Sequence, residues 1–211
     1  MQKGRGEGMI VIIDYGMGNI GSIMNMIRKA GGESTFTSNP EIIAHATKLI
    51  LPGVGSFDHG MRNLKESGLI RVMNQKVCEE KIPVLGICLG MQLMSRSSEE
   101  GVLPGLGWID AETVKFRFGN DLDLRIPHMG WNDVTVMHEK PLFQSMPEEP
   151  SFYFVHSYHL ECRDQYDIAC TTQYGYEFAS AIIHENIMAT QFHPEKSHKF
   201  GLQVIRNFVE L

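Results

Sequence analysis

The sequence predicts an α/β fold with a mostly parallel central sheet flanked by helices, followed by a strand-rich C-terminal half. Short continuous apolar runs at 10–13, 48–51 and 83–87 are typical of strands that are buried on both faces. Segments with helical character at 19–30 and 69–80 lie between these runs. Because strands that alternate with helices join through right-handed crossovers, these five segments indicate a parallel sheet with helices on its faces.

The second half of the chain, after Gly107, contains few helical patterns until its last segment. Residues 197–211 have apolar side chains at helical spacing and are expected to close the chain as an amphipathic helix. We expect one domain over 9–211, with residues 1–8 as a flexible extension or a remnant of cloning. Strand-like stretches in this half lie near 108–116, 132–138, 152–157, 167–172, 179–184 and 187–192.

The composition and charge of the chain indicate which partners and which cellular compartment to expect. The chain of 211 residues has 43% hydrophobic and 21% charged residues, which is ordinary for a folded globular protein. Its formal net charge of -6 disfavours nucleic acid or an anionic membrane as the partner, because both attract basic surfaces. The four cysteines form no C-x-x-C pair, and no apolar run reaches the ~20 residues needed to span a bilayer. We therefore expect a cytoplasmic protein without a metal or another cofactor.

The strongest chemical signal is Cys88 in the segment PVLGICLGMQ at 83–92. The cysteine lies between Gly86 and Gly90, where a buried strand gives way to a helix, and this is the arrangement of a nucleophile elbow. Helix N–H groups at such a turn stabilise the thiolate, which is the reactive form of cysteine. A buried structural cysteine is the alternative, and it is our interpretation of the three cysteines that lack flanking glycines, Cys78, Cys162 and Cys170.

A second signal is the segment QFHPEKS at 191–197, which follows the last predicted strand. His193 and Glu195 are two residues apart, so in extended chain their side chains share one face. Pro194 favours extended geometry for itself and for the histidine before it. Alone, this tripeptide indicates no more than a surface turn. Together with the cysteine elbow it predicts a base, His193, oriented by a carboxylate, Glu195.

The segment LPGVGSF at 51–57 is a strand end that runs into two glycines around Val54. Such a turn can direct a backbone N–H at an oxyanion, and with the N–H of Leu89 it would form a hole with two donors. A simple glycine turn is the alternative interpretation. We expect the N–H groups of Val54 and Leu89 to form the oxyanion hole.

Taken together and in this order, LPGVGSF, GICLGMQ and QFHPEKS resemble the class I, or triad-type, glutamine amidotransferases over most of the chain. The resemblance implies that Cys88 attacks the glutamine carboxamide, that His193 serves as base and acid, and that Glu195 orients it. It also implies a set of residues that contact glutamine: Gly53, Gly55, Gln92, Ser157 and Tyr158.

Three further stretches are similar to the glutaminase subunits of imidazole glycerol phosphate synthase: DYGMGN at 14–19, PHMGWN at 127–132 and FYFVHSYH at 152–159. This resemblance implies a heterodimer with a (β/α)8 barrel cyclase, to which ammonia passes in histidine biosynthesis. It places the partner face near Trp131, Tyr153 and Lys196.

Three alternatives stay open at this point. A paralogous glutaminase subunit would feed ammonia to an enzyme that amidates a cell-surface sugar. A binding module without catalysis would use the same fold to regulate a partner. A cysteine peptidase would need an extended peptide groove beside Cys88.

Overall fold

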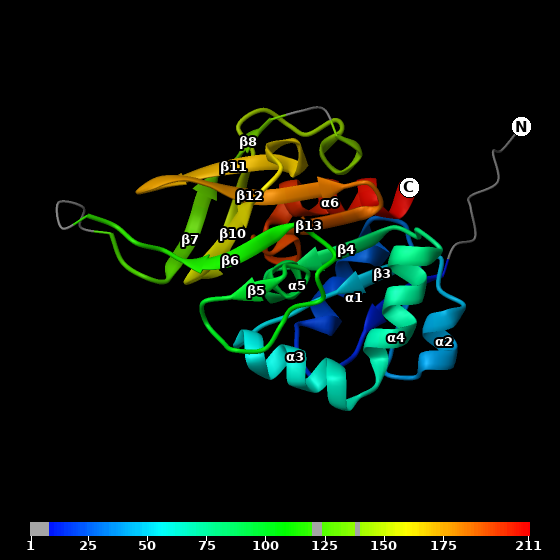
Figure 1. Cartoon of the computed structure of the whole chain (residues 1–211). Helices are drawn as coiled ribbons and strands as arrows, with labels where there is room; N and C mark the ends of the chain where they lie inside the picture. Colours follow the sequence, from blue (N-terminus) through cyan, green and yellow to red (C-terminus); the bar gives the residue numbers. More distant parts are fainter. Residues whose placement is uncertain (1–8, 120–123, 138–139) are drawn as a thin grey trace, which may run out of the picture.

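The computed structural model describes residues 9–119, 124–137 and 140–211, so the predicted extension at 1–8 lies outside the described residues. A large sheet of eleven strands runs through the molecule in the order β2-β1-β3-β4-β13-β12-β10-β6-β5, and β11 pairs with both β12 and β8 (Figure 1). Its strands are β1 (Ile10–Ile13), β2 (Ser34–Thr37), β3 (Lys48–Leu51), β4 (Val84–Ile87), β5 (Ser97–Ser98), β6 (Ala111–Lys115), β8 (Thr135–Val136), β10 (Tyr158–Cys162), β11 (Ile168–Tyr174), β12 (Tyr176–His184) and β13 (Ile187–Thr190).

A smaller sheet joins β7 (His128–Asp133) to β9 (Ser151–His156) in antiparallel register. The α-helices of the described residues are α1 (Ile20–Lys29), α2 (Pro40–Ala44), α3 (Phe57–Glu66), α4 (Leu69–Asn74), α5 (Leu89–Leu93) and α6 (His198–Glu210). None of these helices is long and apolar enough to cross a membrane.

The two faces of the parallel half bury two separate cores, which explains why its strands are apolar without interruption. In β1, Val11 and Ile13 belong to the core that α3 and α4 cover, whereas Ile10 and Ile12 belong to the core that α1 and α6 cover. β3 alternates in the same way. Five strands, β2, β1, β3, β4 and β13, are parallel, and β12 then reverses direction. The prediction of an α/β fold with a mostly parallel central sheet is confirmed.

Most predicted elements lie where the sequence places them, with two corrections. The stretch expected at 132–138 is two strands in different sheets, because β7 begins at His128 and ends at Asp133, and β8 pairs instead with β11. The helix expected over 69–80 is divided in two. The α-helix α4 ends at Asn74, and a π-helical turn follows at Gln75–Glu79. The sequence patterns do not predict β2, β5, β10, α2 or α3.

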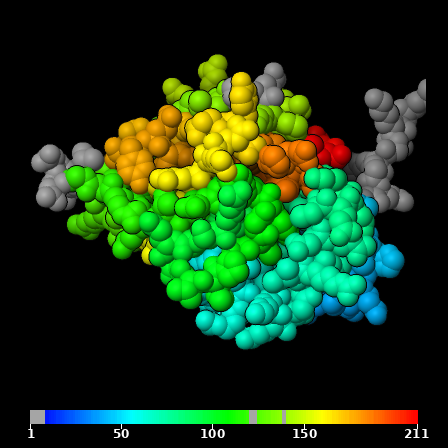
Figure 2. Space-filling model, in the orientation of Figure 1, coloured from blue at the N-terminus to red at the C-terminus, as the bar shows by residue number. Residues whose placement is uncertain are grey.

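The order of the strands places two distant segments side by side. β4 and β13 are parallel neighbours, with Ile87 opposite Thr190. The residues that follow them, from Cys88 and from Gln191 onward, therefore emerge at the same edge of the sheet. In the space-filling view, the green middle of the chain packs between the cyan N-terminal helices and the yellow and orange strands (Figure 2).

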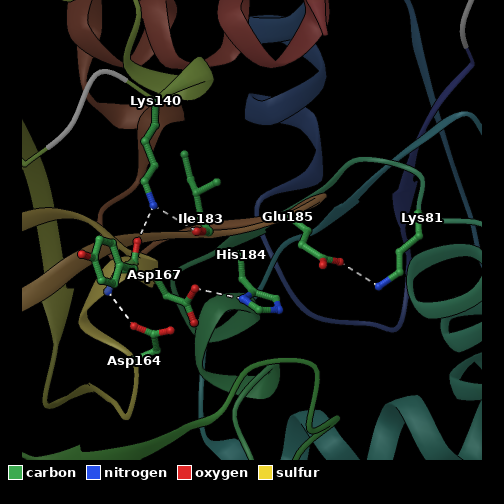
Figure 3. A network of polar contacts seen from close by, with 8 residues as sticks. Lys81, Lys140, Asp164, Asp167, Ile183, His184 and Glu185 are labelled. Carbon is green, nitrogen blue, oxygen red and sulfur yellow. Dashed lines mark hydrogen bonds and ion pairs between the residues drawn. The ribbon is translucent and has the colours of Figure 1, made fainter.

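Polar contacts surround the turn between β12 and β13, at the end of β13 that lies away from Gln191 (Figure 3). Nδ1 of His184 lies 2.9 Å from Oδ1 of Asp167, and the Lys81 ammonium lies 2.9 Å from Oε2 of Glu185. The ammonium group of Lys140 donates to the carbonyls of Tyr166 and Ile183. Solvent screens contacts of this kind at the surface, so we assign this network to local anchoring.

Candidate active site

Cys88 directly follows β4 and has φ 54° and ψ -111°, a conformation that is strained for any residue except glycine. Its N–H donates to the Thr190 carbonyl at 2.8 Å, and its own carbonyl accepts from the Met91 N–H at 3.0 Å. The first bond ties the turn to β13 and the second starts α5. These two bonds stabilise the strained backbone, which is the conformation expected of a nucleophile elbow.

Two glycines allow the turn after β3 to pack against this elbow. A Cβ atom on Gly90 would lie 1.8 Å from the Leu51 carbonyl oxygen, which no side chain could tolerate. A Cβ atom on Gly53 would lie 2.7 Å from the Leu89 Cβ and 2.8 Å from the Tyr15 hydroxyl. Both glycines are therefore required by close approach.

The DYGMGN stretch after β1 contacts the same turn through the side chain of Tyr15. The buried hydroxyl of Tyr15 donates to the Pro52 carbonyl at 2.7 Å. Burial and, secondarily, the charge of Cys88 raise the pKa of this tyrosine well above its ordinary value, so the hydroxyl keeps its proton. Tyr15 thus fixes the residue that precedes Gly53.

His193 and Glu195 follow β13 and pair as predicted. The Nδ1 atom of His193 lies 2.8 Å from Oε1 of Glu195, and their side chains are 2% and 1% exposed. Burial lowers the pKa of His193, whereas its interactions with Cys88 and then with Glu195 raise the pKa, with a net result of about 10. Nε2 of His193 has no hydrogen-bond partner among the described residues. Because Glu195 occupies Nδ1, only Nε2 of this imidazole is left to exchange a proton.

A cavity of about 310 Å³ opens beside the cysteine, a volume at the lower end of the range for small-molecule sites. It brings together most of the predicted site residues. The residues that line it are Val54, Gly55, Cys88, Leu89, Gln92, Glu100, Pro127, Val155, His156, Ser157, Tyr158 and His193. Gly53 does not line the cavity, because it packs behind the turn against Leu89 and Tyr15.

Sequence reasoning missed Glu100, which brings a carboxylate into this cavity. Its Oε2 atom accepts from the Phe57 N–H, at the start of α3, at 2.8 Å. The residue lies in an irregular stretch between β5 and β6, where no local pattern distinguishes it from the neighbouring Glu99. No group of three or more His, Cys, Asp or Glu residues arranged to hold a metal ion is found in the described parts of the chain.

The predicted partner residues also lie together: Trp131 and Tyr153 are on the small sheet, and Lys196 is in the turn that follows His193. Trp131 and Tyr153 are a cross-strand pair of β7 and β9, and Trp131 is 49% exposed. The Lys196 ammonium lies 5.4 Å from the centre of the Tyr153 ring. The Tyr153 carbonyl accepts from the His193 N–H at 2.9 Å. One backbone hydrogen bond therefore connects this surface directly to His193.

The hydroxyl of Ser197 provides a second link between His193 and Tyr153. It donates to the His193 carbonyl at 2.7 Å and accepts from the Tyr153 N–H at 3.0 Å. Ser197 is completely buried. The segment from His193 to Ser197 is thus held along one edge of β9, whereas β7 occupies the other edge.

Comparison with known proteins agrees with this geometry. The model of the family "Glutamine amidotransferase class-I" matches residues 11–211. The chain belongs to the class-I glutamine amidotransferase family. Members of this family hydrolyse glutamine, and this chain is an enzyme of that class. The predicted family and enzyme class are confirmed.

Among curated members of the family, imidazole glycerol phosphate synthase subunit HisH 2 of Methanococcus maripaludis is 57% identical over 202 residues, which cover 96% of this chain and 99% of that protein. The subunit of the same name from Pseudomonas aeruginosa is 48% identical, covering 96% and 100%. Subunit HisH of Bdellovibrio bacteriovorus is 44% identical over the same shares. These relatives do not favour the alternative of a sugar-amidating branch.

Solved structures of the family share the fold at lower identity. The structure of PurLQS from Thermotoga maritima has a TM-score of 0.72 at 15% identity and covers 95% of this chain and 97% of that one. A glutamine amidotransferase from the same organism has a TM-score of 0.63 at 16% identity, covering 89% and 76%.

Proposed function

We propose that this chain is the glutaminase subunit of an imidazole glycerol phosphate synthase, in which Cys88, His193 and Glu195 release ammonia from glutamine for a (β/α)8 cyclase. The observation that carries the catalytic assignment is that His193, paired with Glu195, lines the same cavity as the strained Cys88. The relatives that are 44 to 57% identical over 96% of the chain support the choice of synthase.

The first half of the reaction forms a thioester. The Cys88 thiolate attacks the carboxamide carbon of glutamine, and the carbonyl electrons move onto oxygen. His193, whose raised pKa keeps it protonated at neutral pH, gives its proton to the amide nitrogen, and the C–N bond breaks to release ammonia. Glu195 stabilises the imidazolium and fixes which nitrogen faces the cavity.

The second half regenerates the cysteine. Water attacks the thioester carbon, His193 accepts a proton from that water, and the C–S bond breaks to give glutamate and the thiolate. The N–H groups of Val54 and Leu89 are the proposed donors to both oxyanions, since both residues line the cavity beside Cys88. Loss of one such donor costs about 100- to 1,000-fold in rate.

Glutamine itself is proposed to bind between Glu100 and the segment of Ser157 and Tyr158. The Glu100 carboxylate suits the α-ammonium group of a free amino acid. Gln92 donates its amide N–H groups to the Tyr158 carbonyl and to Gln191, which leaves its own carbonyl oxygen to accept from the substrate. A small cavity with these groups favours a free amino acid over the extended chain that a peptidase binds, and the assembled triad disfavours a silent binding module.

The cyclase is proposed to contact Trp131, Tyr153 and Lys196, because this surface bonds directly to the segment that carries the base. Ammonia would then leave the cavity toward the acceptor subunit. The cytoplasm stays the predicted compartment.

The experiment is to measure synthesis by the reconstituted complex with glutamine and, separately, with ammonium. Cys88→Ala should abolish glutamine-dependent synthesis and leave ammonium-dependent synthesis intact, because the thioester step is confined to this chain. Residual glutamine turnover in the purified variant would exclude Cys88 as the nucleophile. A complex that makes product from neither nitrogen source with the wild-type chain would exclude the proposed partner.

A further inference from the structure

The carbonyl oxygen of Tyr158 accepts two side-chain hydrogen bonds next to the cavity. Nε2 of Gln92 lies 3.1 Å from it, and Nδ1 of His156 lies 2.8 Å from it. A backbone carbonyl can only accept, so both side chains must present an N–H here. This fixes the orientation of the Gln92 amide and the tautomer of His156 without any assumption about hydrogens.

The first arm of this network leads from Gln92 to the nucleophile. Nε2 of Gln92 also lies 3.1 Å from Gln191, which must therefore present its carbonyl oxygen. The amide of Gln191 then has its N–H groups on the other side, where Nε2 lies 3.8 Å from the Cys88 sulfur. Gln191 is completely buried and Gln92 is 5% exposed, so neither amide can turn toward solvent.

The second arm leads from His156 to β7. Because His156 donates through Nδ1, its Nε2 accepts from Nδ1 of His128 at 3.0 Å. Nε2 of His128 in turn lies 3.1 Å from Nδ2 of Asn132. The contacts of Asn132 give the same assignment independently. Its Oδ1 accepts from the Asp133 N–H and its Nδ2 donates to the Gln173 carbonyl at 3.0 Å, so Nδ2 also presents an N–H to His128.

Both ends of this arm require neutral imidazoles with the proton on Nδ1. A second proton on either ring would set two N–H groups against each other. Burial acts in the same direction, because it lowers the pKa of His128 to about 4 and the pKa of His156 well below its ordinary value. The polarity of the network is thus fixed over the physiological pH range.

We propose that Gln191 is a positioning residue for the nucleophile, whose amide N–H is directed at the Cys88 sulfur by the Tyr158 carbonyl through Gln92. The inference rests on the proposed function, since it takes Cys88 as the attacking group. An N–H donor stabilises a thiolate more than a thiol, because hydrogen bonds to charged acceptors are roughly twice as strong. The thiol form has a different neighbour, the Val155 carbonyl, which lies 4.0 Å from the sulfur and can only accept.

Other charged or titratable groups also lie around Cys88. His193 interacts with it from the segment after β13, and Tyr15 interacts from the loop after β1. Glu195 acts through His193, and Glu100 contributes a carboxylate to the cavity wall. Gln191 carries no charge, unlike His193, Glu195 and Glu100, and it directs an N–H at the sulfur, whereas the Tyr15 hydroxyl donates to the Pro52 carbonyl. Replacement of Gln191 should therefore change the reactivity of the thiol more than the binding of glutamine, because Gln92 keeps its bond to the Tyr158 carbonyl.

The test is the pH dependence of Cys88 alkylation by iodoacetamide in the full chain, followed on the Cys88 peptide by mass spectrometry. Gln191→Met keeps the shape of the side chain and removes the N–H. A hydrogen bond to a charged group corresponds to roughly 10- to 100-fold, so alkylation near neutral pH should slow by about that factor and its profile should move to higher pH. kcat should fall while KM for glutamine stays near the wild-type value.

A second variant and a control complete the design. Gln191→Glu keeps the acceptor for Gln92 but presents an oxygen to the sulfur, so it should slow alkylation further than Gln191→Met. Gln165→Met is the matched control, because the Gln165 amide donates to the Cys162 carbonyl at 3.1 Å, away from the cavity. It should match the wild type. In the wild-type chain, the side-chain amide proton resonances of Gln191 should follow the ionisation of Cys88 and stop doing so in Cys88→Ala.

A folded Gln191→Met or Gln191→Glu with a wild-type alkylation profile would overturn the inference, as would Gln191 resonances that ignore the ionisation of Cys88. These results are distinct from failure of the proposed function. If Cys88→Ala kept glutaminase activity, the nucleophile would be wrong whatever the alkylation profile. If Cys88→Ala were inactive and the alkylation profiles were unchanged, only the role of Gln191 would be wrong.

Discussion

Replacing Ser197 by alanine tests whether the proposed base, His193, is held in place by the small sheet. The hydroxyl of Ser197 joins the His193 carbonyl to the Tyr153 N–H. In Ser197→Ala the His193 carbonyl keeps a second donor, the Lys196 N–H at 3.0 Å. The Tyr153 N–H loses the acceptor that the hydroxyl supplies. The substitution therefore leaves one partly buried donor, the Tyr153 N–H, unsatisfied and removes one of the two bonds that join β9 to the segment of His193.

The expected losses of stability and of rate follow from one unsatisfied N–H and one lost bond. A buried backbone group left without a partner costs about 1 to 3 kcal/mol. For a chain of this size each kcal/mol lowers the melting temperature by about 2 to 4 °C, so the variant should melt roughly 2 to 12 °C below the wild type. Because a misplacement near 1 Å can cost ~100-fold in rate, partial loosening should lower kcat about tenfold.

The assay is thermal unfolding together with steady-state glutamine turnover in the assembled complex. Ser180→Ala is a suitable control, because Ser180 is completely buried and its hydroxyl has no hydrogen-bond partner among the described residues. It should retain the wild-type melting temperature or gain slightly. If Ser197→Ala matched the wild type in both melting temperature and kcat, the proposed attachment of the base to β9 would be refuted.

Two further predictions concern the base and the elbow. Because the pKa of His193 is raised to about 10, the proton it donates is present at neutral pH and lost as the pH rises through that value, so kcat/KM should decline at that alkaline limit. Glu195→Gln removes one cause of the raised pKa and should move this decline to lower pH in a pH–rate profile; an unmoved limb would exclude Glu195 as the orienting group. Gly90→Ala should destabilise the fold by roughly 3 kcal/mol, since its Cβ would overlap the Leu51 carbonyl. Gly21→Ala, on open helix surface, should stabilise it by up to about 1 kcal/mol in denaturant unfolding, and equal effects of the two substitutions would contradict the close approach at the elbow.

The sequence predicted those parts of the fold in which local pattern and burial agree. β1, β3 and β4 are continuous apolar runs because helices cover both of their faces, and the sequence shows this directly. α3 was missed because Gly60 interrupts a helix whose exposed face is strongly polar. β2 was missed because its residues, Ser34 to Thr37, form a partly exposed edge strand without an apolar run.

The candidate site shows the same division between local and long-range information. Cys88 and His193 were predicted from glycine spacing and from a tripeptide, and each signal lies within a few residues of chain. Glu100 and Gln191 carry no such signal. Their positions depend on pairing between strands that are distant in sequence, such as β4 with β13, which no local window contains.

The backbone of Cys88 has a consequence for how this chain could evolve. Its φ of 54° and ψ of -111° suit glycine alone, and a residue with a side chain held in such a region costs of order 1 to 3 kcal/mol. An inactive Cys88→Gly chain should therefore unfold at a higher temperature than Cys88→Ala, and above the wild type as well. Selection for stability of the folded chain alone would replace this cysteine, so it can be kept only while the organism depends on the thiol chemistry that we propose for it.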